Sequence, residues 1–408
     1  MTLKINKEYF LQFFFSVCVI IPFFNNYELS FLLWVFAAIF TIKKTYSKTF
    51  VYYLLHFIII FLIAFVVSFF YKNKLYFVIR DVTYMFKPIL GLFLGYNLFN
   101  KNIKSPFLFL INTGVIMAII HLIFVFYGII FQGARAVSEI REYGGYFNDY
   151  EIYALILLLF YKKFDVELTQ KQYTFYLVIM AFSTFFYLAR TNFIQFVILF
   201  MAIKGWLILN KKSFYVLGSL ILISILSYSA IYVYNPKRNG DSVNEFLYKI
   251  KLIPQEAFAT KINRSDWKDF HDHYRSYENV RTIEQLSYNN SLLFGEGLGS
   301  QVDLKQKVRL GDMDLRYISI LHNGYMTVFL KAGIPGLFLL FSSIFYFFKK
   351  QSFVNEVDNN VNLLLIGTGI FLLVSYWVFM GFYNLLDSKT LLIGFIFAYK
   401  NQLRKNTF

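Results

Sequence analysis

The stretch RYISILHNGYMTVFLKAGIPGL, residues 316–337, joins a polar segment of the chain to an apolar one. His322 and Asn323 open an amphipathic run that ends at Lys331, and the sequence GIPG at residues 333–336 leads directly into an apolar segment. This stretch closes the one long polar segment of an otherwise apolar chain. It therefore predicts that a titratable imidazole lies at a boundary between membrane and water.

The composition indicates an integral membrane protein. The 408-residue sequence is 58% hydrophobic and only 16% charged, whereas soluble proteins carry about 25% charged residues. The apolar residues come in long unbroken runs. The single cysteine, Cys18, excludes an internal disulfide framework. The first apolar run lacks a small-residue cleavage site and a second run follows at once, so we expect a retained helix and not a signal peptide.

The net charge of +16 raises the question of a nucleic-acid partner. No basic–aromatic motif of a nucleic-acid-binding fold occurs in the sequence. Most of the lysines flank apolar runs, as membrane topology requires. We therefore expect the lipid bilayer, and no nucleic acid, as the partner of these charges.

The apolar runs predict an all-α fold, a polytopic integral membrane protein with about 12 transmembrane helices and one long outer loop. Residues 1–234 would hold about nine of these helices, residues 235–333 the outer loop with helical segments near 242–252 and 265–288, and residues 334–408 about three helices and a tail. The expected transmembrane helices lie near residues 9–24, 27–42, 50–71, 77–99, 105–131, 147–161, 173–189, 191–209, 213–234, 334–349, 361–382 and 386–400.

Lysines mark alternate connections between these helices. They are Lys4, Lys7, Lys43, Lys44, Lys48, Lys101, Lys104, Lys162, Lys163, Lys171, Lys204, Lys211, Lys212, Lys349, Lys350, Lys400 and Lys405. Because cytoplasmic loops carry an excess of basic residues, the alternation predicts that both termini are cytoplasmic. The segment 235–320 then lies on the outer side.

The arginines follow a different pattern, since in this topology only Arg404 is cytoplasmic. The other arginines are Arg80, Arg135, Arg141, Arg190, Arg238, Arg264, Arg275, Arg281, Arg309 and Arg316. A guanidinium group grips phosphate oxygens with two parallel hydrogen bonds. Arginine gathered on the outer side therefore indicates an anionic ligand there. The alternative is that the loop arginines pair with acids such as Asp266, Glu278 and Glu284.

Arg80 and Arg190 lie at or inside predicted helices, where charge is costly and often functional. Arg80 shares a helix face with Lys87, and Arg190 occupies the outer turn YLARTN at residues 187–192. The alternative for both is that a long side chain extends to the lipid headgroups.

Among the histidines, His322 is the candidate for chemistry, because an imidazole near water can take a proton from a hydroxyl group. A capping or interfacial histidine is the alternative. His56 and His121 lie inside apolar runs and are expected to be structural. The sequence HDH at residues 271–273 resembles a metal site, but positions i and i+2 do not share a helix face and no third ligand is evident.

Two further segments carry polar or glycine motifs. Three alternate glycines in FGEGLG, residues 294–299, allow close backbone approach, either for a phosphate or in an ordinary tight turn. Asn148 is expected to cap a helix. Asp149 and Glu151 follow it near the outer boundary, where they could pair with Arg135 or Arg141.

Four segments in a fixed order carry a resemblance to a known family. They are the polar run 135–148, Ala189-Arg190-Thr191, Arg264-Ser265-Asp266-Trp267 followed by residues 294–299, and His322-Asn323 with residues 333–336. Together with the twelve-helix layout they resemble the O-antigen ligase/polymerase family of bacterial envelope glycosyltransferases. The corresponding family patterns are Arg…Gly-x-Phe…Asn, Ser-Arg-Gly/Thr, Arg…Trp…Gly-x-Gly-x-Gly and His-Asn…Gly-Ile-x-Gly.

The resemblance implies transfer of a glycan from undecaprenyl diphosphate on the periplasmic face of the bacterial inner membrane, with no metal and no other cofactor. It assigns deprotonation of the acceptor hydroxyl to His322. It assigns the diphosphate to Arg190, Arg264 and Arg80, and contacts with the glycan to Arg135, Asn323 and Tyr325. The implied partners are undecaprenyl-diphosphate-linked glycans, the bilayer and a chain-length regulator protein.

Three functions remain open on the sequence. A polymerase of O-antigen or capsular repeat units is favoured by the breadth of the family. A ligase would use the same chemistry to move finished polymer to the lipid A core. A polysaccharide flippase belongs to another class, in which repeated halves are common, but this sequence shows no internal repeat.

Overall fold

The computed structural model describes residues 7–135, 137–146, 148–187, 189–208, 211–237, 244, 247–248, 250–252, 259, 262, 270, 272–310, 313–349 and 353–405. Helices make up 75% of the structure. The predominantly helical fold that the apolar runs predict is therefore confirmed.

The positions of the helices agree with the predicted ranges. The helices are α1 (Lys7–Ile20), α2 (Tyr27–Thr41), α3 (Lys48–Ser68), α4 (Leu75–Leu98), α5 (Pro106–Phe131), α6 (Val137–Gly144), α7 (Asp149–Leu159), α8 (Gln170–Phe186), α9 (Arg190–Ile203), α10 (Lys211–Tyr234), α13 (Tyr274–Tyr288), α14 (Gly324–Phe345), α15 (Glu356–Phe379) and α16 (Lys389–Lys405). Every predicted transmembrane range overlaps one of them. Asn148 accepts a hydrogen bond from the backbone of Glu151 and so caps α7, as expected.

Within the described residues, four helices are long and apolar enough to cross a membrane. They are Lys48–Ser68, Pro106–Phe131, Gly324–Phe348 and Glu356–Phe379. Shorter apolar helices occupy Tyr9–Phe24, Tyr27–Thr41, Arg190–Ile203 and Ile221–Tyr234. The apolar, helical character of a membrane protein is thus present in the structure.

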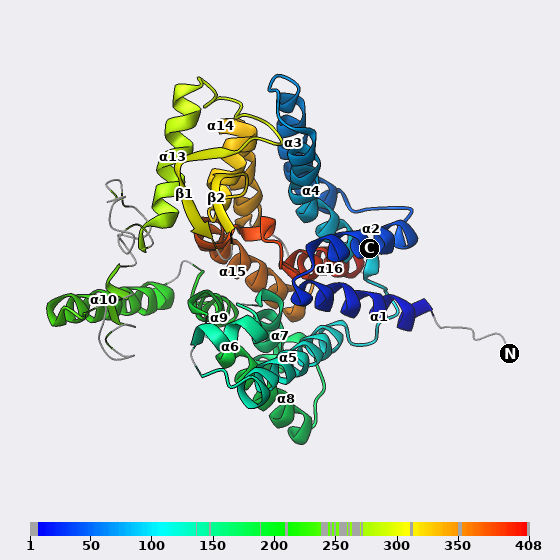
Figure 1. The fold of residues 1–408 in the computed structure, drawn as a ribbon. Coiled ribbons are helices and arrows are strands. Elements are labelled where there is room, and N and C mark those ends of the chain that lie inside the picture. Colours follow the sequence, from blue (N-terminus) through cyan, green and yellow to red (C-terminus); the bar gives the residue numbers. More distant parts are fainter. Residues whose placement is uncertain are drawn as a thin grey trace.

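Helices α4 and α16 pack closely because glycines remove side chains from their contact. A Cβ atom at Gly95 would lie 2.0 Å from the carbonyl oxygen of Leu391, and one at Gly394 would lie 2.1 Å from that of Leu92. Small residues let the backbones of membrane helices approach in this way. In Figure 1, α1 and α2 lie beside this pair, while α10 extends away from the other helices.

Helices α9 and α15 run antiparallel. The Nζ atom of Lys163 donates to the carbonyl oxygen of Ile203 at the end of α9, at 2.9 Å. The carbonyl oxygen of Lys163 accepts from Asn360 Nδ2 near the start of α15, also at 2.9 Å. Further along, Gly367 lies against Leu199. The start of α9 therefore lies at the same end of the bundle as the end of α15.

An antiparallel hairpin, β1 (Val302–Leu310) and β2 (Met313–Ile318), lies within the predicted outer loop and was not expected. It pairs Val302 with Ile318 and has a bulge between Asp303 and Val308. With α13 it covers the beginning of α14 (Figure 1). Buried side chains from α13, the hairpin and α14 form a second hydrophobic core that is separate from that of the bundle.

Helix α14 crosses the predicted boundary between outer loop and membrane. It begins at Gly324 and contains a kink at Gly333, whose backbone angles are φ 62° and ψ −155°. The amphipathic run and the following apolar run are therefore two helices that meet at Gly333, and the second packs back on the first, since Tyr325 stacks on Phe341 at 4.9 Å. The kink is where the outer loop is attached, as described below.

Candidate functional site

His322 and Glu278 form a hydrogen-bonded pair where β2 leads into α14. The Nδ1 atom of His322 lies 3.0 Å from Glu278 Oε1 and 3.1 Å from Oε2. The backbone N–H of His322 also donates to Oε2, at 3.0 Å. The side chain of Glu278 is 1% exposed and that of His322 is 48% exposed. A single buried carboxylate thus fixes both the ring and the backbone of an accessible histidine.

The turn around His322 is held by further hydrogen bonds. The side chain of Asn323 caps α14 by accepting from the backbone N–H of Met326 at 3.2 Å. The hydroxyl of Thr327 donates to the carbonyl oxygen of Asn323 at 3.0 Å and lies 3.2 Å from the backbone nitrogen of Leu321. The imidazole is therefore presented by a rigid helix start and not by a free loop.

Tyr274 lies one helical turn before Glu278 and packs its ring edge-on against His322, with 5.8 Å between ring centroids. Burial and the adjacent Glu278 carboxylate both raise the pKa of the Tyr274 hydroxyl well above its usual value. Tyr274 therefore stays neutral and forms a wall beside the imidazole.

The hydrogen bond between His322 and Glu278 determines which ring nitrogen of His322 can accept a proton. A carboxylate only accepts hydrogen bonds, so the pair assigns the proton of the neutral ring to Nδ1 and leaves the lone pair on Nε2. No other described residue bonds to Nε2. A histidine oriented in this way by an acid can take a proton from a substrate hydroxyl.

Glu278 was considered in the sequence only as a partner for loop arginines. In the structure it binds His322, whereas Glu284 pairs with Arg281 as that alternative expected. The residues of the pair are 44 positions apart. No periodicity or short motif joins them, so the sequence carried no local signal for this contact.

Arg80 is linked to the same segment of the chain. Its guanidinium group donates to the hydroxyl of Ser319, three residues before His322, and its side chain is 32% exposed. It also lies over the ring of Phe77, with 4.9 Å to the centroid. The structure therefore brings Arg80 to the histidine segment, as the predicted site requires. Lys87, predicted on the same face, is instead buried at 1% exposure.

Beneath Arg80, a buried ion pair fastens the outer loop to the bundle. Lys331 Nζ lies 2.6 Å from Asp81 Oδ2, and both side chains are 1% exposed. The backbone N–H of Gly299 donates to the same carboxylate at 2.7 Å, and the hydroxyl of Ser300 lies 3.1 Å from Lys331 Nζ. Charges of opposite sign thus join α4, α14 and the glycine-rich loop.

The glycine-rich loop is a docking segment and not a phosphate cradle. Glu296 donates its backbone N–H to the carbonyl oxygen of Leu330 at 2.7 Å, and Leu298 donates to that of Ala64 at 3.1 Å. Both N–H groups are therefore used by the protein itself. A Cβ atom at Gly333 would lie 2.2 Å from the carbonyl oxygen of Leu293, just before this loop, so Gly333 allows the loop to pack closely against α14.

Arg190 is the first residue of α9, and its side chain is exposed. Arg141 of α6 lies close enough for Arg190 to lower its pKa, although burial contributes more to that shift. Arg141 donates to the carbonyl oxygen of Tyr146 at 3.2 Å. No carboxylate among the described residues pairs with either guanidinium group. Two cations at a helix N-terminus form a favourable environment for an anion.

Thr191 and Asn192 at the start of α9, and Arg141 of α6, have buried polar atoms without partners. The Oγ1 atom of Thr191, both amide atoms of Asn192 and the Nε atom of Arg141 have no hydrogen-bond partner. Asn192 is only 1% exposed. Buried polar groups are nearly always hydrogen-bonded, so this group of atoms is one that a bound ligand could satisfy.

Arg190 and His322 lie at the same end of the bundle. Helix α15 ends beside both sites. Because α15 runs opposite to α9, its end lies near the start of α9. Gly324, at the start of α14, lies against Met380, the residue after α15. Arg275 of α13 stacks over Phe379 at this end, with 5.7 Å to the ring centroid. No described contact joins Arg190 directly to His322.

Two residues expected to contact glycan have structural roles. Asn323 is 1% exposed and caps α14. Tyr325 is 5% exposed, stacks on Phe341 at 4.9 Å and donates to the carbonyl oxygen of Leu373 at 3.1 Å. Because the side chain of Tyr325 is used inside the protein, we do not assign it to glycan binding. The Nδ2 atom of Asn323 has no hydrogen-bond partner, and its contact with glycan stays a prediction. Arg135 is exposed at the start of α6.

Asp149 and Glu151, which could have paired with Arg135 or Arg141, have other partners. Asp149 binds Lys389 at 2.6 Å, and Glu151 accepts from the hydroxyl of Tyr187 at 3.3 Å. Both acids are buried and belong to the core of the bundle.

The remaining histidines behave as expected where they are described. His121 is stacked on Tyr187 at 3.7 Å, and His56 lies 3.1 Å from the hydroxyl of Ser342. His271 and Arg264 lie outside the described residues, so the predicted role of Arg264 stays a prediction.

These observations define the class of the protein: a helical protein with the apolar helices of a membrane protein and a histidine–glutamate pair at one end of its bundle. In comparisons with known proteins, no family model, no curated protein and no solved structure matches this chain.

Proposed function

We propose that this chain is a membrane glycosyltransferase that polymerises O-antigen or capsular repeat units carried on undecaprenyl diphosphate. The observation that supports the proposal best is the pair of a buried Glu278 and an accessible His322. Such a pair is suited to removing a proton from a sugar hydroxyl at the membrane surface.

In the proposed reaction, Nε2 of His322 takes the proton of the acceptor hydroxyl while the oxygen attacks the anomeric carbon of the donor. The bond between that carbon and the diphosphate oxygen breaks, and its electron pair leaves with undecaprenyl diphosphate. Glu278 holds the ring and stabilises the positive charge that His322 gains.

The leaving diphosphate gains negative charge as the bond breaks. Fixed guanidinium groups stabilise that state more than the ground state, and so accelerate the reaction. Arg190 and Arg141 supply such groups at the start of α9, and Arg80 supplies one beside the histidine segment. We assign the diphosphate to the first pair and include Arg264 as a further candidate.

The proposed topology has about 12 transmembrane helices, with both termini in the cytoplasm and the site on the periplasmic face of the bacterial inner membrane. The lysine-rich connections support this orientation. A chain-length regulator protein is the proposed protein partner.

The test uses the purified full-length protein and a defined lipid-diphosphate-linked repeat unit, without a membrane gradient. We expect longer glycans on the lipid carrier. We expect His322→Ala to remain folded and to lose nearly all transfer, because the base is removed. Near-normal transfer by this variant would retire the assignment of His322. Transfer only to lipid A core would indicate a ligase, and movement of substrate without chain growth would indicate a transporter.

A second variant tests the anion site. We expect Arg190→Lys to reduce transfer by about tenfold or more, because a point charge replaces the planar fork. Arg309→Lys, an exposed arginine of β1, is the matched control and should keep full activity. Equal activities for the two variants would show that Arg190 contributes only its charge.

A further inference from the structure

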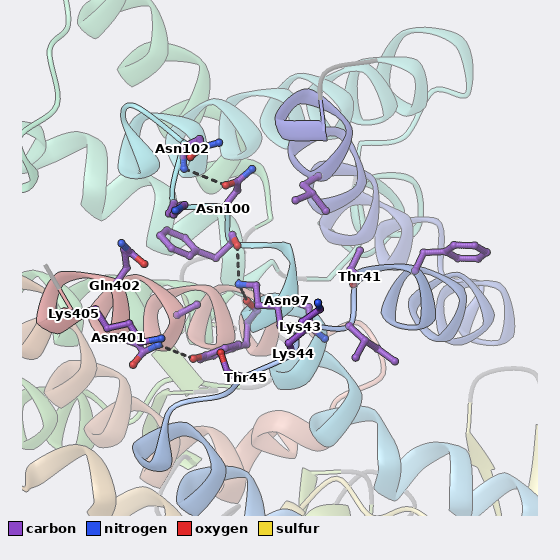
Figure 2. A pocket seen from close by; sticks show the side chains of 17 residues that line it. Thr41, Lys43, Lys44, Thr45, Asn97, Asn100, Asn102, Asn401, Gln402 and Lys405 are labelled. Atoms are coloured by element: carbon purple, nitrogen blue, oxygen red, sulfur yellow. Dashed lines mark hydrogen bonds between the residues drawn. The ribbon is translucent and has the colours of Figure 1, made fainter. Parts of the chain in front are cut away.

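A second concave site lies at the lysine-rich end of the bundle, where α2, α4 and α16 end (Figure 2). Its cavity has a volume of about 630 Å³, which is in the range of sites for small molecules. The residues that line it are Leu11, Phe40, Thr41, Ile42, Lys43, Lys44, Thr45, Tyr96, Asn97, Phe99, Asn100, Lys101, Asn102, Ala398, Asn401, Gln402 and Lys405. We call it the lysine pocket.

The lysine pocket is remote from the histidine site. Helix α16 begins at Lys389, which donates to the carbonyl oxygen of Gly381 at 2.9 Å, just beyond the end of α15. It ends at Lys405, which lines the pocket. The length of α16 therefore separates the two sites, and the role of one does not depend on that of the other.

All the charged side chains that line the lysine pocket are positive. Four lysines line it, and none of the described residues that line it is acidic. Lys43 donates to the carbonyl oxygens of Tyr96 and Phe99, both at 2.7 Å, and so neutralises the end of α4. Lys44, Lys101 and Lys405 have no such acceptor among the described residues. Like charges gathered without a counter-charge favour an anion.

Two features of its surroundings lower the pKa of Lys43. Burial lowers its pKa, and Lys405 lowers it further, to about 8. A bound anion would oppose both effects by stabilising the ammonium form.

A buried amide supplies a hydrogen-bond donor without an acceptor. Asn97 is 1% exposed, and its Oδ1 accepts from the hydroxyl of Tyr46 at 3.0 Å. Its Nδ2 has no hydrogen-bond partner, although the residue lines the pocket. Because buried donors are rarely left unpaired, this atom indicates that an acceptor binds here. Figure 2 shows Asn97 among Lys43, Lys44 and Asn401.

From these features we propose that the lysine pocket binds a phosphate-bearing anion, with Asn97 Nδ2 and the ammonium groups of Lys44, Lys101 and Lys405 as donors to its oxygens. The ligand is either an anionic lipid headgroup or a small soluble phosphate compound. Basic pockets between membrane helices bind such headgroups. Phe40 and Ile42 at the pocket are 65% and 63% exposed, which suits contact with acyl chains.

The test measures binding to the purified full-length protein by native mass spectrometry. The lipid probes are phosphatidylglycerol and, as the headgroup without net charge, phosphatidylcholine; the soluble probe is inorganic pyrophosphate. We expect the parent to bind phosphatidylglycerol or pyrophosphate saturably. Which of the two binds identifies the source of the phosphate group.

The variant Lys44→Gln/Lys101→Gln/Lys405→Gln removes three charges from the pocket, and we expect it to weaken binding by about tenfold or more. The matched control removes three exposed lysines elsewhere, Lys162→Gln/Lys171→Gln/Lys349→Gln, and should change binding by less than about twofold. Equal losses in both variants, or no saturable binding by the parent, would overturn the proposal.

Asn97→Asp provides an independent variant that keeps every lysine. It preserves an acceptor for the hydroxyl of Tyr46 and replaces the unpaired donor with a carboxylate. We expect anion binding to fall by about tenfold or more, with the protein still eluting as a folded species. A folded Asn97→Asp protein that binds the anion as the parent does would refute the role of this donor.

Discussion

The substitution Glu278→Gln tests the mechanism more directly than removal of His322, because it changes one acceptor atom into a donor and keeps the volume of the side chain. In the parent, the carboxylate accepts from Nδ1 and from the backbone N–H of His322, at 3.0 Å each. The glutamine amide can accept through only one of its two terminal atoms. If the amide oxygen of the glutamine still accepts from the backbone N–H of His322, its NH2 group faces Nδ1 of His322.

That contact favours the other tautomer of His322, with the proton on Nε2 and the lone pair on Nδ1. A hydrogen bond to a charged group contributes about 1.5–3 kcal/mol, which corresponds to about 10- to 150-fold in the tautomer equilibrium. The substitution also removes the negative charge that stabilises the protonated ring in the transition state. We therefore expect transfer to fall by about 10²- to 10⁴-fold in total.

The assay is single-turnover transfer from a purified lipid-diphosphate-linked repeat unit, with thermal unfolding in detergent as the measure of folding. Glu284→Gln is the matched control, because Glu284 lies on the same helix and is 53% exposed. We expect it to retain activity within about twofold. The double variant Glu278→Gln/His322→Ala should be no slower than His322→Ala alone, since the two residues act as a unit.

The reasoning fails if folded Glu278→Gln protein transfers glycan as fast as the Glu284→Gln control. The hydrogen bonds to His322 would then have only a structural role. It also fails if the double variant is much slower than His322→Ala, because independent effects would multiply.

Two further substitutions test how the outer loop is held. Gly333→Ala should lower the free energy of unfolding by about 3 kcal/mol or more, because φ is 62° and the new Cβ would lie 2.2 Å from the carbonyl oxygen of Leu293. Gly218→Ala is the control and should leave the free energy of unfolding unchanged, because the space around Gly218 is open. Equal melting temperatures for the two variants would contradict the predicted strain at Gly333. Arg316 donates to the carboxylate of Asp303 at 2.9 Å and holds the pKa of Asp303 well below its usual value. This bridge therefore stabilises the fold above about pH 4 and is lost as the pH falls further. The melting temperature of the parent should fall over that range relative to that of Asp303→Asn, and parallel curves would refute this.

The helical part of the fold is local in origin, and for that reason the sequence predicts it well. Long apolar runs and capping residues such as Asn148 act within one helix. The hairpin was missed because it interrupts a polar segment in which helices were expected, although β1 alternates apolar and polar residues from Val302 to Leu304 and again from Val308. The bulge between them breaks the period, which weakens the signal.

The candidate site depends on contacts between distant parts of the chain. His322 was predicted because its place at a helix start is visible in the sequence, but Glu278 reaches it from 44 residues away. Arg190 was predicted from its turn, whereas its neighbour Arg141 belongs to another connection. Tyr325 was assigned to glycan on the family resemblance, but in the structure it is buried in the core.

The presence or absence of a counter-charge distinguishes structural charged residues from candidates for ligand binding. Two buried lysines have their counter-charges: Lys331 is paired with Asp81, and Lys389 with Asp149 and Asp387. Lys87, which is also buried, donates instead to the carbonyl oxygens of Asn384 and Leu385. A buried charge without a partner is costly, so these pairs explain why lysine is tolerated there without any substrate.

The guanidinium groups at the start of α9 are different. Arg141 and Arg190 have no carboxylate partner among the described residues and repel one another, and Asn192, two residues after Arg190, has unpaired polar atoms. Their mutual repulsion is unfavourable for the protein alone, and the anion proposed above would relieve it. The same argument applies to the lysine pocket, where positive charge and an unpaired amide also occur together. In both places the missing counter-charge, and not the mere presence of basic residues, is what indicates a ligand.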